Sequence, residues 1–266
     1  MLPFAHDLHV HTYLSACCAD PLQRPDGILA QAKSLGRAVI GFSDHLWMNP
    51  HQEPNAWYRP QDARQIVRLR EDLRAVDTAM RVLVGCEADT LAPGRFSITA
   101  EFARGLDFVN LSCSHFHIRD VVQQPPDADP RSLGTHLLTF FVSAVQSGFA
   151  TTIVHPLLPC GSEALYDLAI AALSDAELLD ALAIAAAQGV ALEITPSFIP
   201  PSTGIWSLET PLRVLTLAKC AGCRFTFGSD AHSLPGLARL ELIHPLVAGL
   251  ALSDDDLAPI TKGVTP

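Results

Sequence analysis

The segment Asp7-Leu8-His9-Val10-His11-Thr12 carries the residues whose types and spacing best suit metal chemistry, and it closes the first apolar run of the chain. Alternate residues of a β-strand point to the same face, so Asp7, His9 and His11 should project together. Imidazole and carboxylate groups suit Zn, Mn and Fe as ligands. A His-x-His pair is common by chance, and the metal interpretation therefore depends on what the rest of the chain supplies.

An apolar run followed by a residue of a metal-binding type recurs along the whole sequence. In each case the polar residue stands at the C-terminal end of the run. The groups that follow the later runs are Ser43-Asp44-His45, Glu87 with Asp89, Ser114-His115-Phe116-His117, His155-Pro156, Glu193, and Ser229-Asp230-Ala231-His232.

Helices are expected between these runs, so that strand and helix alternate about seven times along the chain. The clearest predicted helices are Gln61–Met80, Leu133–Ser147, a helix from the capping box Ser174–Glu177 to about Gln188, and Glu209–Ala221. This alternation predicts parallel strands. An open sheet would place its site at one switch point, whereas here every strand brings a candidate ligand to the same edge. We therefore predict an α/β fold, with residues 1–266 forming a single (β/α) barrel domain of seven strands and the chemistry at its C-terminal mouth.

Three long segments that contain proline break the alternation, at residues 46–60, 118–131 and 196–207. They lie on the predicted mouth and are candidate substrate walls. Arg59, in the first segment, is a candidate substrate-binding residue. Arg119 is a second candidate, because a guanidinium can grip a phosphate through two hydrogen bonds. The alternative for Arg119 is ordinary surface solvation, and the alternative for the segment of Arg59 is that its aromatic residues simply pack down.

The composition of the 266-residue chain limits its partners. A hydrophobic fraction of 48% is enough for a large buried core. We find no apolar stretch typical of a membrane span and no basic segment typical of a signal peptide, so we expect no membrane partner and a cytoplasmic location. Seven scattered cysteines favour reduced thiols. The formal net charge of −10, without a basic run, argues against long nucleic acids.

Taken together, these residues resemble the PHP family (polymerase and histidinol phosphatase). The matching pieces occur in family order: Asp7-x-His9-x-His11-Thr12, Ser43-Asp44-His45, Glu87, His115, His155-Pro156, Glu193 and Gly228-Ser229-Asp230-x-His232. The resemblance implies a distorted (β/α)7 TIM-like barrel with a trinuclear metal site. This agrees with the barrel predicted from the alternation of strands and helices.

The resemblance also implies a set of metal ligands. They are His9, His11, Glu87 and Asp230 for one metal, Glu87, His115 and His155 for a second, and His45 with His232 for a third. Many family members place a further histidine at the third metal, and here Cys17 stands in that stretch. A thiolate binds zinc at about 2.3 Å. We therefore expect two or three divalent metals, with Cys17 as the departure from the family pattern.

Further roles are assigned around these ligands. Asp230 and His232 are expected to take part in catalysis. His117 shares a strand face with His115 and is either a substrate or proton-transfer group or an alternative ligand. Carboxylates near the ligands are expected to orient the histidine rings, with a strand-end cap as the alternative for Asp7 and Asp44. Glu193 either has such a role or contacts substrate, with a buried carboxylate at a helix N-terminus as its alternative. These carboxylates are Asp7, Asp44 and Glu193.

Neighbouring divalent cations lower the pKa of a bound water, orient a phosphoryl group and neutralise the leaving oxygen. We therefore expect metal-dependent hydrolysis of a phosphate ester, with a small soluble phosphomonoester as the substrate, as in histidinol phosphatases. One alternative is a phosphodiesterase or exonuclease that acts on short nucleotides. Another is a metal-dependent amidohydrolase, which is disfavoured because no lysine ends a predicted strand.

Overall fold

The computed structural model describes residues 4–262, and strands within this part of the chain form two sheets. The smaller sheet has the order β1-β2-β3, and the larger has the order β5-β4-β6-β7-β8-β9. Neighbouring strands are parallel except in the β4–β5 hairpin. The strands are β1 (His6–Val10), β2 (Val39–Phe42), β3 (Arg81–Val84), β4 (Cys86–Ala92), β5 (Arg95–Phe96), β6 (Val109–Ser112), β7 (Thr152–Val154), β8 (Ala191–Ile194) and β9 (Phe225–Phe227).

The two sheets together make a distorted barrel with seven strand positions. Only Gly85 separates β3 from β4, so these two strands occupy one position. A Cβ atom at Gly85 would lie 2.5 Å from the Phe108 carbonyl oxygen, and this close passage requires glycine. On the other side, the Asp230 N–H donates to the His9 carbonyl at 2.8 Å and links β9 to β1. Short links of this kind, rather than one continuous ladder, complete the predicted (β/α)7 ring.

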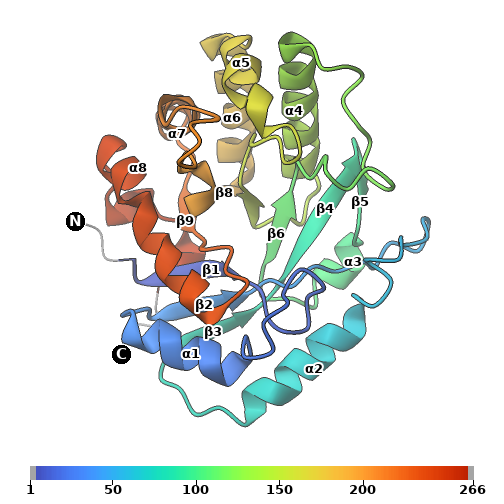
Figure 1. The fold of residues 1–266 in the computed structure, drawn as a ribbon, viewed down its shortest axis with the longest axis vertical. Coiled ribbons are helices and arrows are strands. Elements are labelled where there is room, and N and C mark those ends of the chain that lie inside the picture. The colour runs from blue at the N-terminus through green and yellow to red at the C-terminus, as the bar shows by residue number, and fades with distance from the viewer. Residues whose placement is uncertain (1–3, 263–266) are drawn as a thin grey trace.

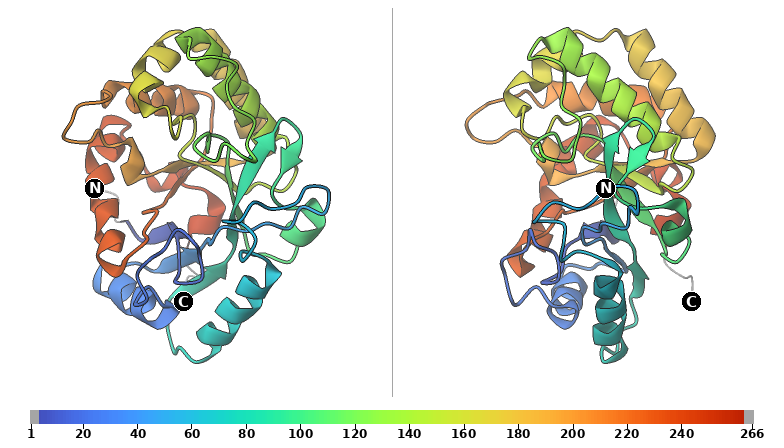
Figure 2. Two further views of the ribbon diagram at one scale, coloured as in Figure 1. Left: turned by 45° about the vertical axis from the view of Figure 1, so that its right-hand side comes forward. Right: turned by 90° about the vertical axis from the view of Figure 1, so that its right-hand side faces the viewer.

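Helices lie on the outside of the strands. Figure 1 shows α1 and α2 beside the smaller sheet and α4 to α7 beside the larger one, and the rotated views in Figure 2 show the same arrangement. The helices are α1 (Pro25–Ser34), α2 (Ala63–Arg74), α3 (Ala100–Ala103), α4 (Pro130–Val145), α5 (Tyr166–Ala171), α6 (Asp175–Gln188), α7 (Glu209–Cys220) and α8 (His244–Gly249). None of the described helices is long and apolar enough to cross a membrane.

The helix boundaries follow local capping signals. At α6 the predicted capping box of Ser174 and Glu177 is present, and Gly189 ends the helix with a φ of 68°. Helix α4 begins at Pro130, earlier than expected, because Asp129 caps the N–H of Ser132 and proline is tolerated in a first turn. Helix α7 ends one residue before its predicted end.

The predicted helix 61–80 was too long at both ends. Helix α2 starts after Asp62, whose side chain caps the N–H of Arg64, and it ends at Arg74. Valine, aspartate and threonine follow at 76–78, and these residues have low helix propensity. The chain must also extend here, because the Arg81 N–H pairs with the Ala38 carbonyl at 2.9 Å to start β3. A single domain over 1–266 stays a prediction, since residues 1–3 and 263–266 lie outside the described part.

Candidate metal centre

The strand ends bring the predicted ligands together at one mouth of the barrel. Parallel strands share one direction, so their C-terminal ends meet on one side. His155 and Asp230 have φ values of 32° and 52°, which residues other than glycine rarely adopt. Backbone strain of this kind is common at functional sites. The residues that reach the mouth are His9 in β1, His11 after it, His45 after β2, Glu87 in β4, His115 after β6, His155 after β7, and Asp230 and His232 after β9.

Glu87 lies at the centre of this group and is 1% exposed. Its Oε2 atom faces the Nε2 atoms of three histidines, His9 at 3.2 Å, His11 at 3.4 Å and His45 at 3.3 Å. Its Oε1 atom faces the Nε2 atoms of two others, His155 at 3.1 Å and His115 at 3.6 Å. One buried carboxylate therefore serves both halves of the cluster, as expected of a ligand shared by two metals.

The hydrogen bonds of Nδ1 in His9 and His115 indicate which ring nitrogen carries the hydrogen. The Nδ1 of His9 lies 2.7 Å from Oε1 of Glu193, and the Nδ1 of His115 lies 2.6 Å from Oδ1 of Asp89. An ionised carboxylate can only accept, so in both rings Nδ1 carries the hydrogen. In the neutral form of each ring, the Nε2 lone pair then points at an oxygen of Glu87. Acceptors that face each other in a buried site need a cation or a proton between them.

The distances between donor atoms also fit a metal. Two ligands held by one tetrahedral zinc at about 2.0–2.1 Å lie about 3.3 Å apart. The Nε2 atoms of His9 and His11 are 3.2 Å apart, and Oδ1 of Asp230 lies 3.5 Å from the first and 3.2 Å from the second. The residues present therefore fit a divalent transition metal at this position.

Ligand-type side chains gather in groups of three, whose ligand atoms all lie within 4.8 Å of one another, and three of the four groups share His11. The groups found among the described residues are His9–His11–Asp230, His11–His45–Glu87, His11–Cys17–His232 and His115–His155–Cys160. Cys17 thus lies with His232, as the resemblance implied, but also with His11, while His45 groups with His11 and Glu87. The assignment of each ligand to a particular metal stays a prediction.

The charges of the cluster shift its pKa values strongly. Burial lowers the pKa of His9, but the carboxylates of Glu193, Glu87 and Asp230 outweigh burial and raise it to about 10. Burial raises the pKa of the Cys17 thiol, but the charge and hydrogen bond of His11, with hydrogen bonds from other histidines, lower it to about 3. Without metal, the cluster holds protons on nitrogen and leaves this sulfur ionised.

We expect metal binding to release protons and to strengthen as pH rises. With a pKa of about 10, His9 is protonated at neutral pH in the metal-free protein, and a metal must displace that proton. The raised pKa values of His115 and His155 act in the same direction. Each pH unit between 6 and 8 should raise affinity about tenfold for each proton released per metal.

Titration calorimetry in buffers with different ionisation enthalpies measures this release directly. Chelator-stripped protein is titrated with Zn²⁺ at several pH values, with Zn²⁺ titrated into buffer as the control. An affinity that stays constant from pH 6 to pH 8 would contradict the expected proton release.

The three carboxylates expected to orient the histidine rings behave differently. Glu193 does orient a ring, that of His9, and its Oε2 accepts from the His155 N–H at 2.8 Å. The hydrogen bonds of the other two go to backbone and hydroxyl groups beside the ligands, and their role in orienting the rings stays a prediction. Asp7 accepts from the backbone N–H of His9 and of Ser229, at 3.3 and 2.9 Å. Asp44 holds both the N–H and the hydroxyl of Thr12, at 2.6 and 2.7 Å. These two carboxylates fix the backbone beside the ligands.

Two residues of the site, Asp89 and Cys160, were given no role by sequence reasoning. Asp89 accepts from His115 and from the Tyr58 hydroxyl, so it orients that histidine. Its signal was available, because Asp89 follows Glu87 by two positions on β4 and therefore shares its face. Cys160, in the turn after β7, lies with His115 and His155, and its distance in sequence gave no comparable signal.

A cavity of about 240 Å³ opens above the cluster. Each of the three long loops predicted as substrate walls contributes one residue to its lining, namely Trp57, Ile118 and Ser197. His117 also lines it, with its ring centroid 5.0 Å from that of His115. Arg59 and Arg119 are exposed and do not line it, so their role as substrate contacts gains no support from this geometry.

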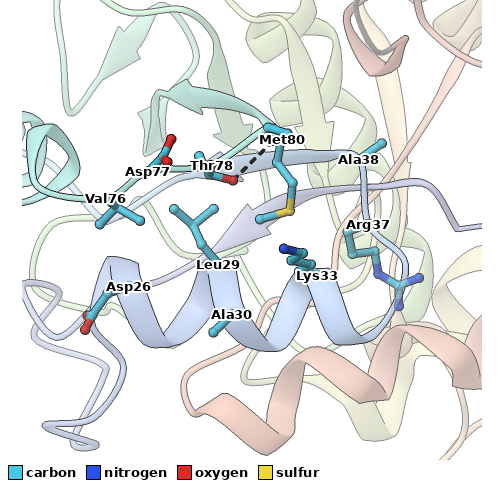
Figure 3. Close-up of a pocket in the computed structure, with 11 residues that line it drawn as sticks. Asp26, Leu29, Ala30, Lys33, Arg37, Ala38, Val76, Asp77, Thr78 and Met80 are labelled. Atoms are coloured by element: carbon cyan, nitrogen blue, oxygen red, sulfur yellow. Dashed lines mark hydrogen bonds between the residues drawn. The ribbon is translucent and has the colours of Figure 1, made fainter.

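A larger cavity of about 730 Å³ lies away from the metal ligands. It is formed by α1 and by the segments that lead into β2 and β3, at the opposite ends of those strands from the mouth. Figure 3 shows Lys33 and Met80 on its walls, beside Arg37. No group of metal-ligand side chains is found among the described residues that line it, whereas members of all such groups line the smaller cavity.

Comparison with known proteins identifies the family of the chain. A family model described as the PHP domain matches residues 7–197, well over half of the sequence. The chain belongs to the PHP family. The resemblance inferred from the metal motifs is therefore confirmed, although Asp230 and His232 lie beyond the matched PHP segment. No curated protein matches the chain in sequence.

Solved structures agree with the PHP assignment at the level of the fold. The histidinol phosphate phosphatase HISK from Lactococcus lactis subsp. lactis Il1403, complexed with Zn, L-histidinol and phosphate, is 16% identical, with 94% of each chain covered and a TM-score of 0.57. The putative histidinol phosphatase hisK from Listeria monocytogenes is 12% identical, with 90% of this chain and 99% of that chain covered and a TM-score of 0.62. The predicted TIM-like barrel is thus confirmed.

Proposed function

We propose that this PHP protein is a metal-dependent phosphoesterase that hydrolyses a small phosphomonoester. The observation that carries the proposal is the buried Glu87 carboxylate, which faces five histidine Nε2 atoms at the floor of a cavity. Two or three bound ions of Zn, Mn or Fe would supply an activated water and positive charge for the phosphoryl group. The same group of ligands therefore supports both metal binding and phosphate ester chemistry.

The lining of the cavity favours a phosphate held by metals. Among the described residues that line it, none is lysine or arginine. A phosphate dianion there would depend on metal charge for its neutralisation, which metal-bound sites can provide. The lysines Lys33, Lys219 and Lys262 do not line this cavity either, which disfavours an amidohydrolase with a lysine-derived ligand.

The size of the cavity favours a small monoester over a polynucleotide. A volume of about 240 Å³ is below the usual range of about 300–1,000 Å³ for ligand pockets. It suits a phosphoryl group with part of a small leaving group. Histidinol phosphate is the first candidate, because the Lactococcus lactis neighbour is complexed with L-histidinol and phosphate. A cytoplasmic location remains part of this proposal.

A substrate panel with defined metals tests the proposal. Chelator-free protein is analysed for metal and then assayed with Zn, Mn or Fe on phosphomonoesters including histidinol phosphate, phosphodiesters, short oligonucleotides and cyclic amides. We expect about two or more transition metals per chain and hydrolysis of monoesters. Activity only on diesters or oligonucleotides would replace the proposal with the phosphodiesterase alternative. Activity only on amides, or metal-loaded protein inactive on every ester, would overturn it.

A further inference from the structure

The turn after β7 holds Cys160 against the loop that carries His115. The Cys160 N–H donates to the carbonyl of Ser114, the residue before His115, at 3.1 Å. The next residue is Gly161, where a Cβ atom would lie 3.0 Å from the backbone of His117. The two loops therefore pack backbone to backbone, and the cysteine side chain reaches the cavity lining beside the two histidines.

Three donor atoms meet at this point, and the carboxylate of Glu87 faces the two histidines among them. The Sγ of Cys160 and one ring nitrogen each of His115 and His155 lie within 4.8 Å of one another. Oε1 of Glu87 lies 3.1 Å from the Nε2 of His155 and 3.6 Å from that of His115. Ligands of a tetrahedral zinc lie about 3.3–3.5 Å apart, given bonds of about 2.0–2.1 Å to nitrogen or oxygen and 2.3 Å to sulfur.

We propose that Cys160 is a fourth protein ligand, as a thiolate, of the metal held by Glu87, His115 and His155. The inference rests on the proposed metal-dependent function and goes beyond the ligands that the family pattern supplies. The S–H bond of Cys160 breaks and an S–metal bond forms, with the proton released to solvent. A set of one sulfur, two nitrogens and one oxygen closes the tetrahedron and favours zinc over harder cations such as Mn or Mg.

A closed coordination shell would give the metal at Cys160 a different role from the metal that binds water and substrate. Four protein ligands leave no open position for water or phosphate at a tetrahedral zinc. The metal at Cys160 then acts mainly as a fixed positive charge beside Glu87. Exchangeable positions for water and substrate would then lie at the metal near His45 and His232, which has at most three expected protein ligands and faces the cavity.

The test uses sulfur spectroscopy on the metal-loaded full chain. Because Cys17 is a second candidate thiolate, all samples carry Cys17→Ser. The cobalt-loaded Cys17→Ser protein should retain a thiolate-to-cobalt charge-transfer band. In Cys17→Ser/Cys160→Ser the intensity of this band should fall by about tenfold or more, while the protein still binds cobalt. The matched control is Cys17→Ser/Cys220→Ser, because Cys220 is an exposed thiol at the end of α7. This control should keep the band.

X-ray absorption of zinc-loaded Cys17→Ser gives a second reading that needs no change at Cys160. A sulfur neighbour at about 2.3 Å from zinc is expected. A metal-loaded Cys17→Ser protein with no cobalt–thiolate band and no sulfur near zinc would overturn the proposal, as would a band that persists after Cys160→Ser. Those results would leave metal-dependent phosphatase activity standing. Failure of the wild-type protein to bind any transition metal would instead overturn the proposed function.

Discussion

Replacing Glu87 with alanine should remove more metal than any single histidine substitution and should lower kcat/KM by about 1,000-fold or more. Its two oxygens face histidines on both sides of the cluster, with distances of 3.1–3.6 Å. Loss of the carboxylate therefore withdraws one ligand and one negative charge from two metals together. Metal content measured after dialysis and steady-state kinetics on the best monoester test this expectation.

Two further variants make the Glu87 result interpretable. Glu87→Gln keeps the size of the side chain, so a similar loss of metal would show that charge, rather than packing, is responsible. Glu71→Ala removes an exposed carboxylate on α2 and should change neither metal content nor activity. Loss of metal equal to that of His9→Ala would show that Glu87 does not bridge.

Gly228→Ala should destabilise the fold by about 1–3 kcal/mol and weaken metal binding by about 10–100-fold. A Cβ atom at Gly228 would overlap with the carboxylate of Glu193 and lie 2.5 Å from the Cβ atom of His9. Glu193 orients the ring of His9 and holds the backbone of His155. One methyl group should therefore displace the groups that position ligands on two strands.

Chemical denaturation of the metal-free protein and zinc titration separate the two effects of Gly228→Ala. Gly105→Ala is the matched control, because its Cβ atom would meet only the Phe102 carbonyl, at an ordinary 3.4 Å. This control should leave stability and zinc affinity close to the wild-type values. Wild-type zinc affinity in a folded Gly228→Ala protein would mean that Glu193 does not position His9.

Several features of the barrel could be predicted because they depend on near neighbours in sequence. The position of His9 and His11 at the C-terminal end of β1 follows from the first apolar run. The capping box of Ser174 and Glu177 starts α6, and Gly189 ends it. Alternation of strands and helices determines parallel order, and parallel order places all strand ends at one mouth.

Other details required the tertiary structure, because their partners are far apart in the chain. Asp44 is of a residue type that can orient a histidine ring. In the structure its carboxylate instead accepts from Thr12, which the packing of β1 against β2 brings within reach. Helix α2 is shorter than its periodicity suggests, because residues 75–80 must extend into β3.

The sequence by itself determined the residue types of the metal centre and the end of the barrel at which they gather. The tertiary structure decided which of them touch. Cys160 lies 45 positions after His115 (160 − 115), and the packing of two separate loops, with a backbone hydrogen bond from Cys160 to Ser114, brings the two side chains to one point. Periodicity reports the face on which a side chain lies, whereas the distance between two faces depends on how separate loops pack.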